Sequence, residues 1–516
     1  MFFDKFLKAS KRFVPSGKKS PSTVKHKAIK GKLDENVEDI LKSTGNPDDL
    51  IIQRIESGAK TAAVVIYFET LTDSNLLSQH MIEPLNQFVQ GTETPSANNL
   101  KIITSASNVI AINDLHQAID SLLAGQALIL IAGAKSIFAV SFPGVPRRAI
   151  EEAPTEKSIK GPKEGFTETI TDNIGLIRRY LKDPNLRLEK KLIGERTKTE
   201  IAVMYLNDVA NPDIVKEVHK RLEQIKIDGI LESGYIAELI SDRRLTLFPL
   251  VQETERPDKV VAAILEGRVA IMVDRSPFNI IVPVTSNEFY QSQEDFYFNW
   301  LAATMMRLIR GLGTIIAVTL PGFYLAMVSV NPELLPPTVV QIEASSRVQV
   351  PFPLVLEMLI TFFAFEVLRE SSIRFPAGIT MILGLGGGIV MGLAAINAGL
   401  VSGITVAVVV FCILGTFSTS NLAKEQAWRW VRYILLFAGA SFGFMGVIAA
   451  GVLVLAHMAS LKSFGVSYMA PWAPPLIVDI ADAPGRLPWW LSYRRPPTYR
   501  PQREDRLGET EGEDEA

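Results

Sequence analysis

Residues 311–330 read GLGTIIAVTLPGFYLAMVSV, and this stretch sets how the rest of the chain is organised. It carries no charge and has the length of roughly 20 apolar residues with which a helix crosses a bilayer core. Arg307 and Arg310 stand just before it, as basic residues often do at a membrane surface. The stretch therefore predicts a membrane span. It separates a charged region before about residue 300 from an apolar region that runs to about residue 460.

Three more apolar stretches predict further spans: Ala377–Ala398, Val401–Thr416 and Tyr433–His457. A fifth stretch, 352–368, reads FPLVLEMLITFFAFEVL; it is short for a span and contains two acids. It is expected to be either a re-entrant or amphipathic helix or a full span that lines a pore.

The preference of positive charge for the cytoplasmic side does not settle the number of spans. Four spans place the arginine-rich C-terminal tail on the cytoplasmic side but leave Lys424, Arg429 and Arg432 outside. Five spans place these three residues on the cytoplasmic side but leave the C-terminal tail outside. We favour four spans and a short helix.

Glu357 and Glu366 are the charged residues of greatest interest, because an ionisable group at membrane depth usually faces a partner or a water-filled path. About 900° of helical rotation separates them, so they lie on opposite sides of one helix. Glu366 is expected to pair with Arg369. Glu357 is then the better candidate for a pore-facing carboxylate that selects cations. The alternative is that Glu357 pairs with an arginine of a neighbouring helix and fixes packing.

Gly384, Gly388 and Gly392 recur every four residues within ILGLGGGIVMGLAA. Such a stripe lets helices approach closely in lipid, so these residues are predicted to form a helix-packing face. A nucleotide-binding loop at GLGGG is excluded because the run lies inside a predicted span.

The charged half shows an internal duplication. Thr61–Glu69 (TAAVVIYFE) and Thr199–Asn207 (TEIAVMYLN) both read as buried strands. Each is followed by a helical stretch and then by two apolar runs around a turn, QALILIAGAKSIFAVSF and RVAIMVDRSPFNIIVPV. The pattern favours two related α/β subdomains in tandem, with a chance resemblance of common α/β patterns as the alternative.

The fold class is therefore an α/β cytosolic region of two tandem subdomains followed by an all-α multi-pass membrane domain. Met1–Phe13 has no apolar core long enough for a signal peptide, so the first half is expected to stay cytosolic. The predicted domains are a basic disordered tail (1–45), two subdomains (46–155 and 156–298), a transmembrane domain (299–465) and a C-terminal cytosolic tail (466–516). The basic tail is either solvated or in contact with anionic membrane lipid.

Composition excludes several functions. The net charge is −2, which disfavours a general binder of nucleic acid. A single cysteine and five scattered histidines exclude a disulfide framework and give no metal or cofactor motif. No set of residues reads as catalytic, so we do not expect an enzyme.

Several stretches together resemble the GerA family of spore germination proteins, of the A-subunit type. They are KGPKEGFTETITDNIGLIRRYL, TLFPLVQETERPDKVVAAILEGRVAIMVDRSPF, QSQEDFYFNW, LLPPTVVQIEASSRVQVPFP, FEVLRESSIRFP and MASLKSFGVSYMAPWAP. The resemblance covers roughly residues 60–490. It departs at Asp274-Arg275-Ser276-Pro277, where the family usually has Gly after the Asp, and this leaves the branch of the family open.

The resemblance implies a multi-pass protein of the inner spore membrane with a cytosolic N-terminal region. It implies a homo-oligomer that conducts monovalent cations when germinant binds, with a transporter-like B subunit and a lipoprotein C subunit as partners. The alternatives are a non-conducting scaffold that transmits a signal, and a member of the amplifying branch that acts with the dipicolinate release machinery.

Overall fold

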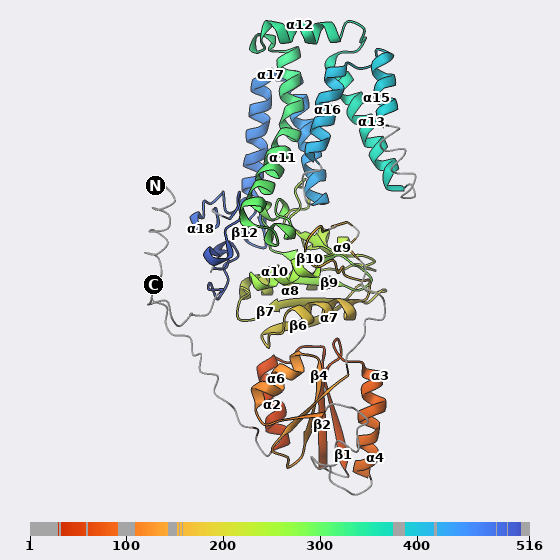
Figure 1. Ribbon diagram of the computed structural model, residues 1–516, viewed down its shortest axis with the longest axis vertical. Helices are drawn as coiled ribbons and strands as arrows, with labels where there is room; N and C mark the ends of the chain where they lie inside the picture. Colours follow the sequence, from red (N-terminus) through yellow and green to blue (C-terminus); the bar gives the residue numbers. More distant parts are fainter. Residues whose placement is uncertain are drawn as a thin grey trace. The chain divides into compact units, whose positions relative to one another are not determined.

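The computed structural model describes residue 29, residues 32–142 and residues 152–506, apart from 58–59, 91–108, 154, 157, 375–387, 417–420, 481 and 493. The chain forms two compact units, Met1–Val145 and Pro146–Ala516. The first unit contains one sheet. The second contains another sheet, a bundle of helices and a C-terminal segment (Figure 1).

The first unit is a five-stranded antiparallel sheet with helices on both faces. Its strand order is β1-β2-β4-β5-β3. The strands are β1 (Leu50–Ser57), β2 (Lys60–Phe68), β3 (Val109–Ile112), β4 (Gln126–Ile131) and β5 (Ile137–Ser141). The helices are α2 (Leu33–Thr44) and α6 (Leu115–Leu123) on one face, and α3 (Ser74–Leu77), a π-helical turn (Ser78–Ile82) and α4 (Glu83–Gln90) on the other.

The second unit begins with a sheet of the same topology, in the order β6-β7-β9-β10-β8. Its strands are β6 (Leu186–Ile193), β7 (Thr199–Leu206), β8 (Gln252–Thr254), β9 (Val269–Val273) and β10 (Asn279–Val282). Helices α8 (Pro212–Glu223) and α9 (Ser233–Ile240) cover one face, and α7 (Ile170–Tyr180) and α10 (Pro257–Leu265) cover the other. Because each strand has its counterpart in the same place, the predicted duplication is confirmed.

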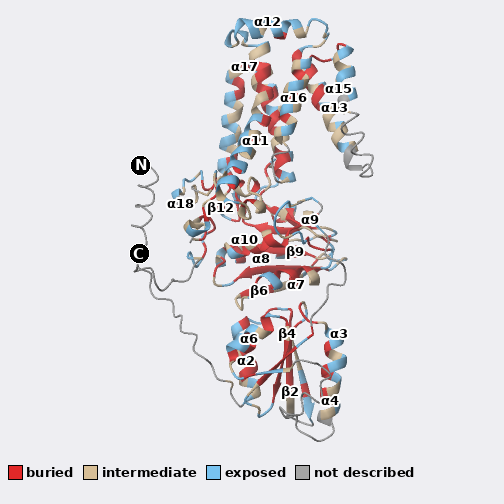
Figure 2. Cartoon of the chain, viewed as in Figure 1, coloured by how far each residue is buried: buried red, intermediate tan, exposed pale blue. Residues whose placement is uncertain are grey.

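The continuous apolar runs are explained by burial on both faces. In β2, Val64, Ile66 and Phe68 enter one core, while Val65 and Tyr67 enter the other. The strand β7 divides its side chains between two cores in the same way. A strand covered on both faces needs no polar alternation. Figure 2 shows the central strands of both sheets as largely buried, whereas the outer strands β1, β3 and β6 contain many partly or fully exposed residues.

The predicted basic tail over 1–45 is too long. Helix α2 lies within that range, and its Val37 and Ile40 are buried in the core of the first unit. The sequence signal was present as an apolar stripe preceded by two acids in the first turn. Residues 1–28 lie outside the described residues.

The second unit continues into a helical bundle. Its helices are α11 (Trp300–Ser329), α12 (Pro337–Ser346), α13 (Leu354–Arg374), α15 (Gly388–Asn397), α16 (Gly403–Thr416) and α17 (Leu422–Ser460). Among the described residues, α11 and α17 are long and apolar enough to cross a membrane. Many large apolar side chains are exposed on the outside of the bundle, including Phe363, Phe411 and Leu453. An apolar outer surface of this kind suits a lipid environment.

The last predicted span, Tyr433–His457, is not one straight helix, because the chain reverses at Gly443. A straight helix of the 39 residues of α17 would be about 58 Å long, roughly twice a bilayer core. Trp428 and His457 would lie about 43 Å apart along it. Instead, their ring centroids lie 5.4 and 6.2 Å from that of Phe248. The helix is therefore a hairpin with arms 422–442 and 444–460.

This reversal places the basic residues at the start of α17 and the arginine-rich C-terminal tail on the same side, which neither four nor five straight spans could do. Lys424 donates to the Ser286 carbonyl at 2.7 Å, so the start of α17 lies next to the second sheet. The segment after α17 returns to the same place, where Phe464 and Val466 complete a core of the second sheet. Further along, Arg495 donates to the Leu265 carbonyl at 2.7 Å. Both basic groups are therefore at the end of the bundle that faces the second sheet.

Close helix packing in the bundle uses glycines other than the predicted stripe. A Cβ at Gly439 would lie 2.4 Å from the Gly322 carbonyl oxygen, and one at Gly415 would lie 2.6 Å from the Gly313 carbonyl oxygen. These contacts join α11 to α17 and to α16. In contrast, a Cβ at Gly388 or Gly392 would meet no described residue within 4 Å. Gly384 lies outside the described residues.

The hairpin predicts which positions share a side of the membrane. With the buried Cys412 replaced by Ser, cysteines at Leu422 and Ser460 should react with a membrane-impermeant maleimide from the same face of sealed vesicles. A cysteine at Phe442, which is 76 % exposed beside the turn, should react from the opposite face. Labelling of positions 422 and 460 from opposite faces would contradict the hairpin.

The packing contacts predict a contrast between two glycines. Gly439→Val forces α11 and α17 apart, and it should lower the free energy of unfolding by about 1–3 kcal/mol. Gly392→Val is the matched control, because its added side chain enters open space. Thermal unfolding of the purified protein in detergent measures both, and equal effects would count against these contacts.

Candidate functional site

The bundle has charged clusters at both ends. The far cluster lies beside α12, at the end away from the second sheet (Figure 1). The near cluster lies at the start of α17. Helix α13 contributes Glu357 to the first and Glu366 to the second. The two acids therefore point to different partners, as their spacing predicts.

Glu357 is at the centre of the far cluster and is 0 % exposed. Its Oε2 accepts from Arg347 Nε at 3.2 Å, and its Oε1 accepts from the Ser402 backbone N–H at 2.6 Å. Arg347 caps the C-terminus of α12, and Ser402 precedes α16. The acid therefore joins three elements of the bundle, which is the arrangement of the packing alternative.

A second acid extends this cluster. Glu343 is buried and accepts from the Tyr324 hydroxyl at 2.7 Å, and that hydroxyl also lies 3.4 Å from Thr405 Oγ1. Counted as ionised, the two carboxylates outnumber Arg347 by one charge. A cavity of about 460 Å³ adjoins Ser402 and is lined by Ser345, Ser346, Val348, Gln349, Val350, Ile396, Gly399, Val401 and Gly403. The carboxylates do not line this cavity, and Glu357 is separated from it by Ser402. A cation would reach Glu357 only through a rearrangement at Ser402 or Arg347.

The near cluster links α13 to α17. Glu366 accepts from Arg429 at 3.0 Å and lies 3.6 Å from Arg432. Arg369, the predicted partner of Glu366, forms an ion pair with Glu425. Glu425 also lies 3.3 Å from Arg429. The contacts of Glu366 and Arg369 thus extend to α17 and form a network between two helices.

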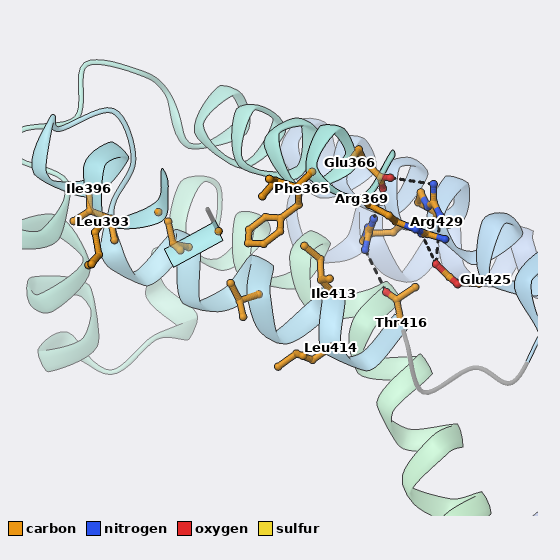
Figure 3. A pocket seen from close by; sticks show the side chains of 16 residues that line it. Phe365, Glu366, Arg369, Leu393, Ile396, Ile413, Leu414, Thr416, Glu425 and Arg429 are labelled. Carbon is orange, nitrogen blue, oxygen red and sulfur yellow. Dashed lines mark hydrogen bonds and ion pairs between the residues drawn. The ribbon is translucent and has the colours of Figure 1, made fainter. Parts of the chain in front are cut away.

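The near cluster forms one end of a lateral groove of about 690 Å³ between α13, α15, α16 and α17. Figure 3 shows its charged side chains at one end and Leu393, Ile396 and Phe365 towards the other. Gly388 and Gly392 line the same groove. These two glycines of the predicted stripe therefore border a groove and make no close helix contact within the described chain.

The junction between the second sheet and α11 is held by one buried acid. Asp295 is 1 % exposed, and its carboxylate lies 3.1 Å from Arg307 Nε and 3.0 Å from Arg310 Nη1. Arg307 also donates to the carbonyls of Asp482 and Gly485 in the C-terminal segment. Burial raises the pKa of Asp482. Three parts of the chain thus meet at this point.

A buried lysine forms the second contact between the sheet and the bundle. The ammonium of Lys424 donates to the Ser286 carbonyl and hydroxyl at 2.7 and 2.6 Å. It lies 4.2–5.9 Å from the ring centroids of Tyr290, Phe289, Tyr468 and Trp428. Burial raises the pKa of the Tyr290 and Tyr468 hydroxyls, so neither adds a negative charge beside Lys424. Aromatic faces stabilise a desolvated ammonium in this way.

The sequence analysis missed several of these residues. Glu343 and Arg347 lie between apolar stretches, where a charge is usually exposed. A signal was present, because both lie within the segment LLPPTVVQIEASSRVQVPFP. Lys424 and Arg429 were noted for topology only, because their partners are distant in sequence. Within the described residues, no group of three or more His, Cys, Asp or Glu side chains is arranged to hold a metal ion.

Comparisons with known proteins connect this arrangement to spore germination. The family model of the Bacillus/Clostridium GerA spore germination protein matches residues 38–498. The chain is 38% identical to spore germination protein KA of Bacillus subtilis (strain 168) over 483 residues, covering 93% of this chain and 89% of that protein. It is 34% identical to spore germination protein GerLA of Bacillus cereus over 470 residues, covering 91% and 96%.

One solved structure is also similar. It is the N-terminal domain of the A subunit of the Bacillus megaterium spore germinant receptor GerK3. The match has 35% sequence identity and a TM-score of 0.39, and it covers 50% of this chain and 96% of that chain.

The junction makes a testable prediction. Asp295→Asn removes the carboxylate shared by the buried Arg307 and the partly buried Arg310, and leaves Arg307 with the carboxylate of Asp482 at 3.7 Å. It should lower the free energy of unfolding by about 3–5 kcal/mol. Limited proteolysis and thermal unfolding in detergent would show the second sheet loosened from α11. The neighbouring Glu294→Gln is the control, because an amide oxygen still accepts from the Ile159 N–H. A variant Asp295→Asn as stable as wild type would refute this role.

Proposed function

Because the chain belongs to the GerA family of spore germination proteins, we propose that it is a membrane subunit of a spore germinant receptor and forms, as a homo-oligomer, a germinant-gated channel for monovalent cations. It is a multi-pass protein of the inner spore membrane with both α/β subdomains in the cytosol. Its partners are a transporter-like B subunit and a lipoprotein C subunit. The alternative within the family is a member of the amplifying branch that acts with the dipicolinate release machinery. No enzymatic activity is part of the proposal.

The far cluster is the observation that carries this proposal. Glu343 and Glu357 are buried at the far end of the bundle, and Glu357 lies behind Ser402, which lines the cavity. Two acids face one arginine there, Arg347. Repetition of this cluster around the axis of an oligomer supplies a ring of carboxylates, and such rings select cations.

The ion pair of Glu357 supplies a gate. In the described conformation Arg347 lies 3.2 Å from Glu357 and opposes cation binding. Arg347 lies at the C-terminus of α12 and is partly exposed, so a shift of α12 separates the pair without disturbing the backbone contact of Ser402. Opening then consists of moving Arg347 away from the carboxylate.

A non-conducting scaffold is the second candidate, favoured by the junction between the second sheet and the bundle. Asp295 and Lys424 tie that sheet to both α11 and α17. Two such contacts transmit a displacement of the sheet to the helices whether or not ions pass.

Ion flux from liposomes that contain the purified chain, with and without its co-expressed partners, distinguishes these functions. If Glu357 binds the ion, Glu357→Gln should reduce potassium flux at least tenfold, and Arg347→Gln should raise flux in the absence of germinant. The double variant should stay as low as Glu357→Gln.

Other outcomes have different meanings. If the pair only fixes packing, each single variant should impair the protein, and the double variant should recover, because no buried charge is left alone. Glu333→Gln, at an exposed acid outside the far cluster, is the control. An absence of flux in every preparation, with oligomers present, would leave the scaffold as the function.

A further inference from the structure

The lateral groove combines an apolar wall with an arginine that has few acceptors. Arg432 is 3 % exposed and lines the groove. Its Nη1 lies 3.4 Å from Thr416 Oγ1, and its Nη2 lies 3.6 Å from Glu366 Oε1. Both distances are at or beyond the limit of a hydrogen bond. Its buried Nε has no acceptor among the described residues.

A buried guanidinium with five N–H donors and such long contacts is energetically costly. The Phe362 ring, with its centroid 4.4 Å from the guanidinium carbon, offers no lone pair, whereas Tyr433, with its centroid at 5.6 Å, supplies one hydroxyl oxygen as a further hydrogen-bond partner. What Arg432 lacks is an acceptor with several oxygens, and phosphate matches the guanidinium fork in two places at once.

The charge of the groove favours an anion. Arg369, Arg429 and Arg432 line it against only two acids, Glu366 and Glu425, which leaves a net charge of one positive unit. The remaining lining is mainly apolar and comes from α13, α15 and α16. Its volume of about 690 Å³ lies within the usual range for bound small molecules, roughly 300–1,000 Å³.

The position of the charges matches a lipid and not a soluble ion. The charged end lies at the start of α17, one to two turns from Lys424, which contacts the second sheet. The apolar end extends along α15 and α16 as far as Leu393 and Ile396, away from the charged side chains (Figure 3). Open space beside Gly388 and Gly392 leaves the apolar part free for a chain. Basic pockets between membrane helices on the cytoplasmic side are known to hold anionic head groups.

We propose that the lateral groove is a binding site for an anionic phospholipid, with its phosphate on Arg432 and Arg429 and one acyl chain against Leu393 and Ile396. The lipid joins α13 to α17 and stabilises the near cluster. The proposal does not depend on ion conduction, so it can fail or succeed separately from the channel.

Native mass spectrometry of the full chain in detergent, titrated with phosphatidylglycerol, phosphatidylcholine or inorganic phosphate, tests the site. Phosphatidylglycerol should bind at least tenfold more tightly than phosphatidylcholine. Arg432→Gln should reduce the ratio of the affinity for phosphatidylglycerol to that for phosphatidylcholine about tenfold, because a hydrogen bond between charged groups is lost. Its control is Arg244→Gln, at an exposed arginine of the second sheet's subdomain.

A second variant leaves every charge intact. Gly392→Leu fills the apolar part of the groove and should weaken the binding of phosphatidylglycerol at least tenfold. Gly311→Leu also adds a side chain in open space but lies outside the groove, so it should leave the affinity unchanged. These two glycine variants test lipid binding in the groove even if Arg432→Gln does not fold. The proposal would be overturned if the two lipids bound equally, or if free phosphate bound as tightly as phosphatidylglycerol. It would also be overturned if two chains carrying Gly392→Cys crosslinked without lipid, because a second copy of the chain would then occupy the groove.

Discussion

The reversal of α17 at Gly443 is the constraint on which the second unit depends. Gly443 has a φ of 63°, and a Cβ there would lie 2.2 Å from Asn331 Oδ1, so the turn needs a glycine. The Asn331 side chain accepts from the Phe444 N–H at 3.0 Å and fixes the second arm. The reversal brings both ends of α17 to Phe248 and returns the chain to the second sheet.

Helix α13 connects the two charged clusters. Glu357 binds Arg347 at the far end, and Glu366 binds Arg429 at the near end. A rotation of α13 that relieves one pair strains the other, because both acids are fixed to the same rigid helix. Since α17 also carries Lys424 against Ser286, the near cluster is one helical turn from the second sheet. The far cluster is therefore linked to the soluble region through two helices and a few ion pairs.

Local patterns predicted the parts of the fold that depend on local physics. The central strands β2 and β7 and both hairpins were evident because burial on two faces gives uninterrupted apolar runs. The outer strand β6, LRLEKKLI, was missed because its exposed side chains are charged. In the bundle, Glu357 was identified by its depth, but Arg347 was not, because its partner is chosen by the tertiary fold. The hairpin in α17 was not predicted, because Gly443 is one of several glycines in an apolar run and nothing local distinguishes it.

The placement of Phe464 and Val466 in the core of the second sheet has a consequence for synthesis. A ribosome makes the strands of that sheet before the helical bundle and these two residues after it. The second sheet consequently leaves the ribosome with a gap in one of its cores, which stays open until every helix of the bundle has been made. Its last apolar contacts form only after the chain has returned from α17. A completed core of the second sheet thus requires that the whole bundle has already been synthesised.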